Sequence, residues 1–132
     1  MKQKILTTSL SGLVGSRISE LLCRYFEFEN LSRKEGFDIT NIDSLERVIA
    51  KSEADTFIHL AAFTDVNAAW RQKGDKNGAC YRVNVIGTKN VATLCSKYNK
   101  FLIHFSTDFV FSGEKEGIYT EEDNPDPIEW YG

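Results

Sequence analysis

The sequence has few of the residues that build metal sites, disulfide frameworks and membrane spans. Its 132 residues include 3 cysteines and 2 histidines, at spacings that match neither a C-x-x-C pair nor a zinc site. No apolar run approaches the roughly 18 residues of a membrane helix. Arg17 and Glu20 also interrupt the N-terminal stretch that could otherwise pass for an export signal. We therefore predict a cytoplasmic protein with reduced cysteines, no metal and no membrane partner.

An excess of positive charge is also absent. The chain carries 16 Lys and Arg against 19 Asp and Glu, a formal net charge of -3. Such a chain has no overall attraction for nucleic acid, so we predict no nucleic-acid partner, and any bound phosphate must be held by local groups. Its 42% hydrophobic and 27% charged residues are ordinary for one folded domain, which excludes a disordered or collagen-like protein.

Short apolar runs alternate with amphipathic stretches along most of the chain. The runs predict strands and the helical periodicity predicts helices, with the strands at 4–8, 26–31, 56–60 and 101–105 and the helices starting after Gly12, at Ser44 (with Asp43 as its cap) and at Ala79. Strands separated by helices form parallel crossover units, so we predict an α/β fold: a Rossmann-like doubly wound parallel sheet with helices on both faces. Residues 65–78 show no clear pattern, and an acidic loop is expected after Gly113.

The turn between the first strand and the first helix carries the pattern Ser9-x-x-Gly12-x-x-Gly15. Glycines there let the backbone approach a pyrophosphate, and the helix N-terminus supplies unpaired N–H groups. Ser9 stands where such turns usually have their first glycine. Two glycines three residues apart also occur in ordinary strand–helix turns, so the pattern leaves both interpretations open.

The end of the second strand indicates which dinucleotide would be preferred. Proteins that bind NAD usually have an Asp or Glu there for the ribose hydroxyls, whereas this chain has Ser32, Arg33 and Lys34. Cationic side chains at this point suit a 2′-phosphate and favour NADP(H), with NAD(H) and a solvated loop pair as the alternatives. Asp38 and Ile39 are candidates to contact the adenine, although an Asp here is equally suited to a turn or cap.

Longer blocks of sequence carry a family resemblance. The blocks are Ile5–Gly15, Ser32-Arg33 with Asp38-Ile39, Ile58–Val66, Val83–Asn90, Ser106–Gly113, and Tyr119–Pro127 with Tyr131-Gly132. With them the chain resembles, over essentially its whole length, the N-terminal half of an extended short-chain dehydrogenase/reductase. It is most similar to the dTDP-4-dehydrorhamnose reductase family. The Ser-Thr-Asp-Phe-Val-Phe block is specific, whereas Gly12-x-x-Gly15 is shared by many nucleotide binders.

The resemblance implies NAD(P)H-dependent reduction of a 4-keto nucleotide deoxysugar, with a nucleotide sugar as substrate. By position, Thr107 matches the hydroxyl that bonds the substrate carbonyl and Tyr131 matches the proton donor to the developing alkoxide. The alternatives are a Thr107 that caps the next turn and a Tyr131 that is a loop aromatic. The resemblance also implies cofactor contacts from Ser9, Ser11, Gly12, Leu13, Val14, Ser32, Arg33, Asp38, Ile39, Leu60, Ala61, Ala62, Thr64 and Asn84.

The family completes its signature with a Lys four residues after the tyrosine, and the sequence given has one residue after Tyr131. We therefore expect residues 1–132 to be a truncated NAD(P)-binding domain without the C-terminal part of the family fold and its substrate lobe, and to show little ketone reduction alone. The alternatives are a non-catalytic NADP-binding regulatory or partner module of the same fold, or a nucleotide-sugar epimerase or dehydratase. An incomplete sheet would expose an edge and favour a homo-oligomer or the missing half as partner. His59 and His104 are expected to be strand residues packed against helices.

Overall fold

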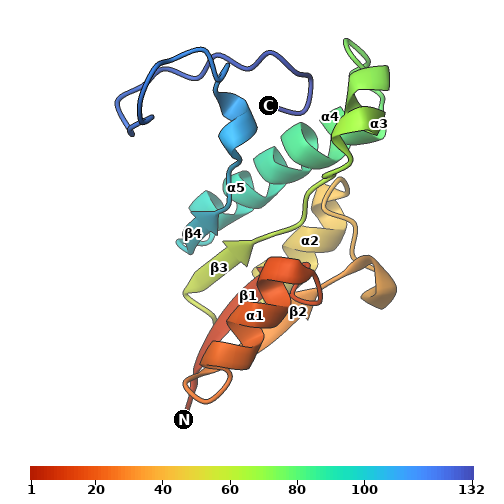
Figure 1. Ribbon diagram of the computed structural model, residues 1–132. Coiled ribbons are helices and arrows are strands. Elements are labelled where there is room, and N and C mark those ends of the chain that lie inside the picture. The colour runs from red at the N-terminus through yellow and green to blue at the C-terminus, as the bar shows by residue number, and fades with distance from the viewer.

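Four short runs rich in β-branched and aromatic residues form one sheet in the computed structural model, which describes residues 1–132. The strands are β1 Gln3–Thr8, β2 Phe26–Leu31, β3 Thr56–His59 and β4 Phe101–His104. Their order across the sheet is β2-β1-β3-β4, so β1 and β3 are the central strands (Figure 1). Each neighbouring pair is parallel.

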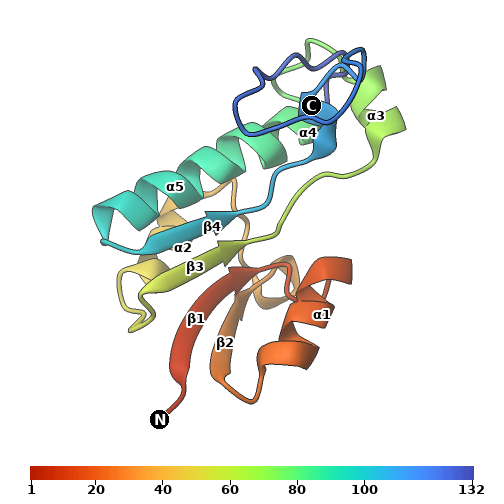
Figure 2. The same cartoon turned by 60° about the vertical axis from the view of Figure 1, so that its left-hand side comes forward.

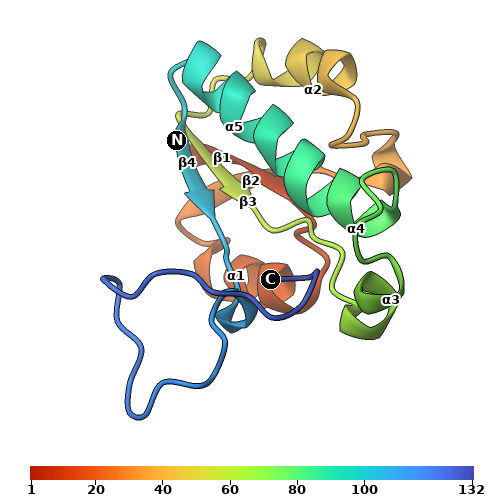
Figure 3. The ribbon, with the colours of Figure 1, turned by 90° about the horizontal axis from the view of Figure 1, so that it is seen from above.

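Helices cover both faces of this sheet. They are α1 Leu13–Leu22, α2 Ile42–Ile49, α3 Val66–Arg71, α4 Ala79–Tyr81 and α5 Thr88–Lys97, with short 3-10 segments η1 Arg33–Glu35 and η3 Asp108–Val110 and a π-helical segment η2 Arg82–Gly87 that joins α4 to α5. α1 lies on one face, and α2 and α5 lie on the other (Figure 2, Figure 3). None of the helices combines the length and the apolar character needed to span a membrane.

The order of the strands confirms the predicted Rossmann-like, doubly wound arrangement. From β1 the chain crosses one face to reach β2 and then returns over the other face to β3, so its connections diverge between β1 and β3. At such a point the carboxyl ends of the strands leave a crevice in which α/β proteins bind ligands. The long loop after η3 lies beyond this same end of the sheet (Figure 2).

The hydrophobic core lies between the sheet and the layer formed by α2 and α5. Its largest members are Leu6 and Phe57 from the strands, Leu45 and Ile49 from α2, and Leu94 from α5. Burying each of these side chains stabilises the fold by roughly 1.5–3 kcal/mol. The opposite face is covered more thinly, because Gly15 is the single buried residue of α1.

Several details differ from the sequence-based expectations. The predicted apolar face of α1 is only partly covered, and Val14, Leu21 and Tyr25 are exposed. The prediction that Asp43 caps α2 was wrong, because the Asn41 side chain accepts from the Ser44 N–H at 3.1 Å. β4 is an edge strand with exposed side chains rather than a covered strand, and His104 is exposed instead of packed against a helix.

The helix predicted from Ala79 is present but contains a π-helical turn. That turn brings Gly87 against Ile39, where a Cβ would lie 2.5 Å from Ile39 Cδ1. A larger residue at position 87 would require the Ile39 side chain to move. The unassigned residues 65–78 form α3, capped by Asp65, and the turn after it.

Candidate functional site

The turn after β1 is held in an uncommon backbone conformation. Ser9 has φ +56, in the left-handed region that glycine adopts most easily. Its carbonyl accepts from the Gly12 N–H at 3.0 Å, and the next amide, Leu10 N–H, donates to Asn30 Oδ1 at 3.0 Å. The turn is therefore fixed from its own backbone and from the end of β2, and a serine tolerates it at a cost of about 1 kcal/mol.

The two glycines of the turn are needed for different reasons. A Cβ on Gly15 would lie 2.6 Å from Leu10 Cα and from the Ser9 and Leu10 carbonyl oxygens, so α1 packs directly onto the turn. Gly12 is the N-cap of α1, which has neither a side-chain cap nor an acidic residue in its first turn. The free N–H groups and the helix dipole make this end suitable for an anion.

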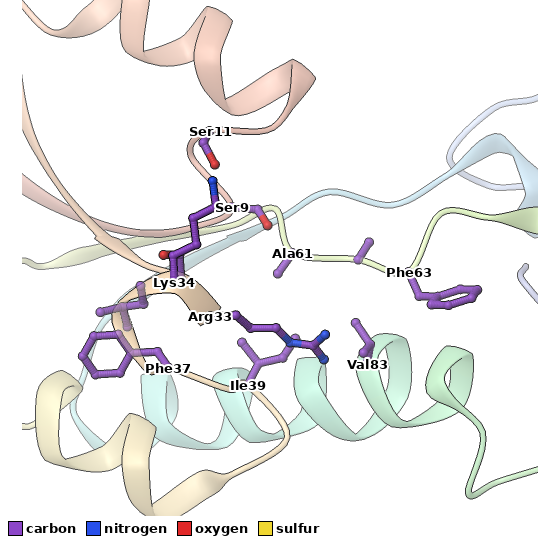
Figure 4. A pocket seen from close by; sticks show the side chains of 12 residues that line it. Ser9, Ser11, Arg33, Lys34, Phe37, Ile39, Ala61, Phe63 and Val83 are labelled. Carbon is purple, nitrogen blue, oxygen red and sulfur yellow. The ribbon is translucent and has the colours of Figure 1, made fainter.

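A cavity of about 270 Å³ lies at the carboxyl ends of β1, β2 and β3. In Figure 4 the Lys34 amino group points toward the turn that carries Ser9 and Ser11, and the Arg33 guanidinium points across the cavity toward Val83. Apolar side chains form the remaining wall, namely Leu31, Phe37, Ile39, Phe63 and Val83. Ser32 also lines the cavity, which thus combines two cations, three serine side chains and an apolar wall.

The charged side chains near this cavity differ in how many hydrogen bonds they make with the protein. Asp38 Oδ1 accepts from the Thr40 N–H at 2.9 Å and the Thr40 hydroxyl at 2.8 Å, and these bonds, the backbone one above all, lower the pKa of Asp38. Arg33 lies 4.0 Å from Asp38 Oδ2, and 72% of its side chain is exposed. Glu35 accepts from the amide and the hydroxyl of Ser32. Asp38 is therefore a turn residue here, whereas Arg33 keeps most of its donors free.

A second, smaller cavity of about 180 Å³ brings together the two residues predicted to be catalytic, Thr107 and Tyr131. The Thr107 hydroxyl caps η3 by accepting from the Phe109 N–H at 3.2 Å and donates to Asp108 Oδ1 at 3.2 Å. The Tyr131 ring packs edge-on against Phe109, with ring centroids 5.4 Å apart. The capping role considered for Thr107 is thus present in the same residue that lines the cavity.

The segment after β3 lies between the two cavities, and Ala61 and Ala62 line both. Asn84, on η2, holds the far end of this segment: its side chain accepts from the Phe63 N–H at 2.7 Å and donates to the Phe63 carbonyl at 3.0 Å. Both ends of the Asn84 amide are therefore used by the backbone. Its position favours a bracing role beside the cavity that it lines.

The structure brings together about half of the residues predicted to contact a cofactor. The first cavity is lined by Ser9, Ser11, Ser32, Arg33, Ile39, Ala61 and Ala62, and the second by Ala61, Ala62 and Asn84. Outside both lie Gly12, Leu13, Val14, Asp38, Leu60 and Thr64. Gly12, Leu13 and Val14 stand at the N-terminus of α1, where backbone N–H groups rather than side chains are suited to bind an anion.

Sequence reasoning missed Asn30, Phe37, Phe63 and Val83. The three apolar residues carry no chemical signature, and only the folded crevice shows that they form one wall. Asn30 left a usable signal, because an Asn at the end of a strand in an α/β sheet can hold a neighbouring turn.

Comparison with known proteins gives a consistent result. The profile of the RmlD substrate binding domain matches residues 3–132. The dTDP-4-dehydrorhamnose reductase of Aggregatibacter actinomycetemcomitans is 32% identical over 130 residues, which are 98% of this chain and 43% of that protein. The chain therefore spans less than half the length of this relative.

Solved structures show the same correspondence. The dTDP-4-dehydrorhamnose reductase of Bacillus anthracis, crystallised with NADP, matches with a TM-score of 0.87 and 32% identity, over 99% of this chain and 45% of that one. The UDP-glucose 4-epimerase of Thermus thermophilus, in complex with NAD, matches with a TM-score of 0.81 and 26% identity, over 98% and 46%. The fold is thus shared by proteins crystallised with either dinucleotide.

Proposed function

The chain belongs to the family of the RmlD substrate binding domain, and from this premise we propose that residues 1–132 are the NADP(H)-binding part of a reductase. Its substrate would be a 4-keto nucleotide deoxysugar, as the names of its relatives suggest. The observation that carries the proposal is the cavity at the switch point, with Arg33 and Lys34 at the end of β2. No carboxylate lines this cavity to receive the ribose hydroxyls of NAD.

The residues present fit this cofactor. At Gly12 and Gly15 a Cβ would crowd the backbone of Ser9 and Leu10, so the glycines keep the turn tight against a helix N-terminus whose first turn has no acidic residue. Lys34 points toward that turn, and Arg33 offers a planar set of donors for a phosphate (Figure 4). The apolar wall of Phe37, Ile39 and Val83 suits an adenine ring.

The second cavity supports the reductive chemistry. NADPH, when bound, supplies the hydride. Tyr131 would donate a proton to the substrate oxygen as charge develops on it, and the Thr107 hydroxyl would turn its hydrogen from Asp108 toward the same oxygen. The three cysteines are free, and burial raises the pKa of Cys95 to about 11, so this thiol is unreactive near neutral pH.

The cofactor assignment can be tested by titrating the 132-residue chain with NADPH and NADH and following nucleotide fluorescence. We expect tighter binding of NADPH, and Arg33→Ala with Lys34→Ala should weaken NADPH about tenfold or more while leaving NADH nearly unchanged. Lys51→Ala is the matched control, because Lys51 is an exposed cation at the opposite end of the sheet. Equal binding of both nucleotides, or an equal loss for both, would contradict the NADP(H) assignment.

Turnover separates the reductase from a non-catalytic module of the same fold. Because residues 1–132 alone are expected to show little ketone reduction, NADPH oxidation is followed in a chimera of this chain with the C-terminal part of the Aggregatibacter relative. The substrate is dTDP-4-dehydrorhamnose, which the relative's name gives. Oxidation that Tyr131→Phe abolishes supports the reductase. NADPH binding with no oxidation, or with oxidation that Tyr131→Phe leaves unchanged, would favour the non-catalytic module.

A further inference from the structure

His59 is a buried polar residue to which the proposed chemistry gives no task. It is the last residue of β3, only 1% of its surface is exposed, and it lies beside Thr8 of β1 in the parallel register. Its ring stacks on His104 of β4, with centroids 5.4 Å apart. A buried imidazole is usually held by hydrogen bonds from both ring nitrogens.

The hydrogen bonds around His59 determine which nitrogen carries its proton. Thr8 Oγ1 accepts from the Leu60 and Ala61 N–H groups, both at 3.0 Å, which occupies both of its lone pairs. Its own hydrogen is then left to donate to His59 Nδ1, 2.8 Å away. The ring proton must sit on Nε2, which donates to Thr88 Oγ1 of α5 at 3.1 Å.

We propose that His59 is a positioning residue: through Thr8 it fixes the backbone of residues 60–62 in the shape that binds the dinucleotide. The relay runs from α5 through β3 to β1 and ends on two backbone amides. Ala61, which carries one of these amides, and the next residue, Ala62, line both cavities, and Thr88 lines the second cavity. This inference rests on the proposed cofactor site.

The relay is needed because β3 ends at His59. The ladder with β1 stops at the Thr8–His59 pair, so the Leu60 and Ala61 amides bond to a side chain instead of a strand. Without the Thr8 hydroxyl, two half-buried N–H groups would lose their partner. Asn84 holds Phe63 beyond them, so the segment between the cavities is fixed at both ends before a ligand binds.

Four variants test the relay. Thr8→Val removes the acceptor of both amides at constant shape, Thr8→Ser restores the hydroxyl, and His59→Phe keeps the stacking on His104 without the ring nitrogens. Val91→Ala is the control, because it weakens the core at α5 and removes no hydrogen bond of the relay. The measurements on each chain are the Kd of NADPH, amide hydrogen exchange at Leu60 and Ala61, and the ¹⁵N spectrum of the imidazole.

We expect Thr8→Val to raise the Kd of NADPH about tenfold and to accelerate exchange at both amides, with His59→Phe acting in the same direction. Thr8→Ser should restore both values, and the wild-type spectrum should show the Nε2–H form of His59. Val91→Ala should lower the melting temperature without changing the Kd. Unchanged exchange in Thr8→Val, or a Kd that follows melting temperature in every variant, would overturn the relay. If the wild type binds neither nucleotide, the proposed function fails, and the exchange and tautomer measurements still decide whether the relay exists.

Discussion

At the scale of single residues, Ser9 is held in a conformation that suits it poorly. A left-handed φ of +56 places the Cβ of an L-residue too close to its carbonyl oxygen. Because the turn keeps this conformation even with serine, we infer that its hydrogen bonds to Gly12 and Asn30 are sufficient to hold it. The backbone shape of a dinucleotide turn is thereby kept without its usual first glycine.

Ser9→Gly should therefore raise the free energy of unfolding by only about 0.5 kcal/mol, because the entropy that glycine adds to the unfolded chain offsets part of the relieved strain. Urea denaturation measures this change. Asn99→Gly is the matched control, since Asn99 has φ +49 and Asn tolerates the left-handed region better than serine. We expect a smaller gain there. A loss of stability in Ser9→Gly would mean that the serine hydroxyl contributes more than the strain costs.

At the scale of elements, α1 depends on direct contact with the turn before it. Gly15→Ala would place a methyl group 2.6 Å from backbone atoms of Ser9 and Leu10, and backbone cannot rotate away as a side chain can. We expect a loss of about 2–3 kcal/mol in the free energy of unfolding, together with weaker NADPH binding, because α1 must lift from the turn. Gly12→Ala meets only the Ser9 oxygen, at 3.2 Å. Equal, small effects of the two substitutions would contradict this packing.

The positions of the strands and of most helices could be predicted from the sequence, whereas the exposure and the long-range contacts of their side chains could not. Apolar runs and periodicity located the four strands and the helices α1, α2 and α5 because these patterns act locally, whereas α3 lies in the stretch without a clear pattern. The exposure of β4 follows from its place at the edge of the sheet, which no local pattern encodes. The π-helical turn at 82–87 ends at Gly87, which lies against Ile39, and a contact between such distant parts of the chain has no local pattern.

The residues of the candidate site likewise fall into two groups: those that a sequence motif indicates and those that only the fold brings together. Ser9, Ser11, Arg33 and the glycines stand in turns whose positions a motif indicates, so the sequence could name them as candidates. The relay of Thr8, His59 and Thr88 draws on three elements, so only the fold brings its members together. No motif around His59 in the sequence indicated a role for it.

At the scale of the whole molecule, His59 gives the folding free energy a defined pH dependence. Burial above all, with the charge of His104 as a smaller cause, lowers the pKa of His59 from 6.5 to about 4. Between these values the unfolded chain binds the proton and the folded chain does not, so stability is full above pH 6.5 and falls as the pH drops toward 4. The difference corresponds to about 3 kcal/mol.

Urea denaturation from pH 7 to pH 4 checks this dependence. The slope between pH 6.5 and pH 5 should largely disappear in His59→Phe, which has no proton to bind there. The carboxylates whose pKa is lowered, such as Asp38, lose their contribution only near and below their ordinary values, so they do not obscure this window. An unchanged slope in His59→Phe would assign the effect to another group.

One face of the molecule carries apolar side chains that residues 1–132 do not cover. Leu102 of β4 packs toward the core, so its neighbours Phe101 and Ile103 point to the opposite face, where α1 lies. α1 adds the exposed Leu13 and Leu21 on this side of the sheet. Beyond β4 there is no further strand, so its outer backbone groups are free to pair.

We expect this face and edge to drive self-association of the 132-residue chain, seen as a sedimentation coefficient that rises with concentration. Ile103→Lys should reduce it most, because a charge on an edge strand opposes both strand pairing and apolar contact. Leu21→Lys should reduce it only if α1 takes part, which separates association along the edge from association through the helix. Lys51→Glu is the control, because Lys51 is exposed and is not one of the apolar side chains of this face, so association should be unchanged. A single monomeric species at every concentration would show that these side chains are tolerated in water as they stand.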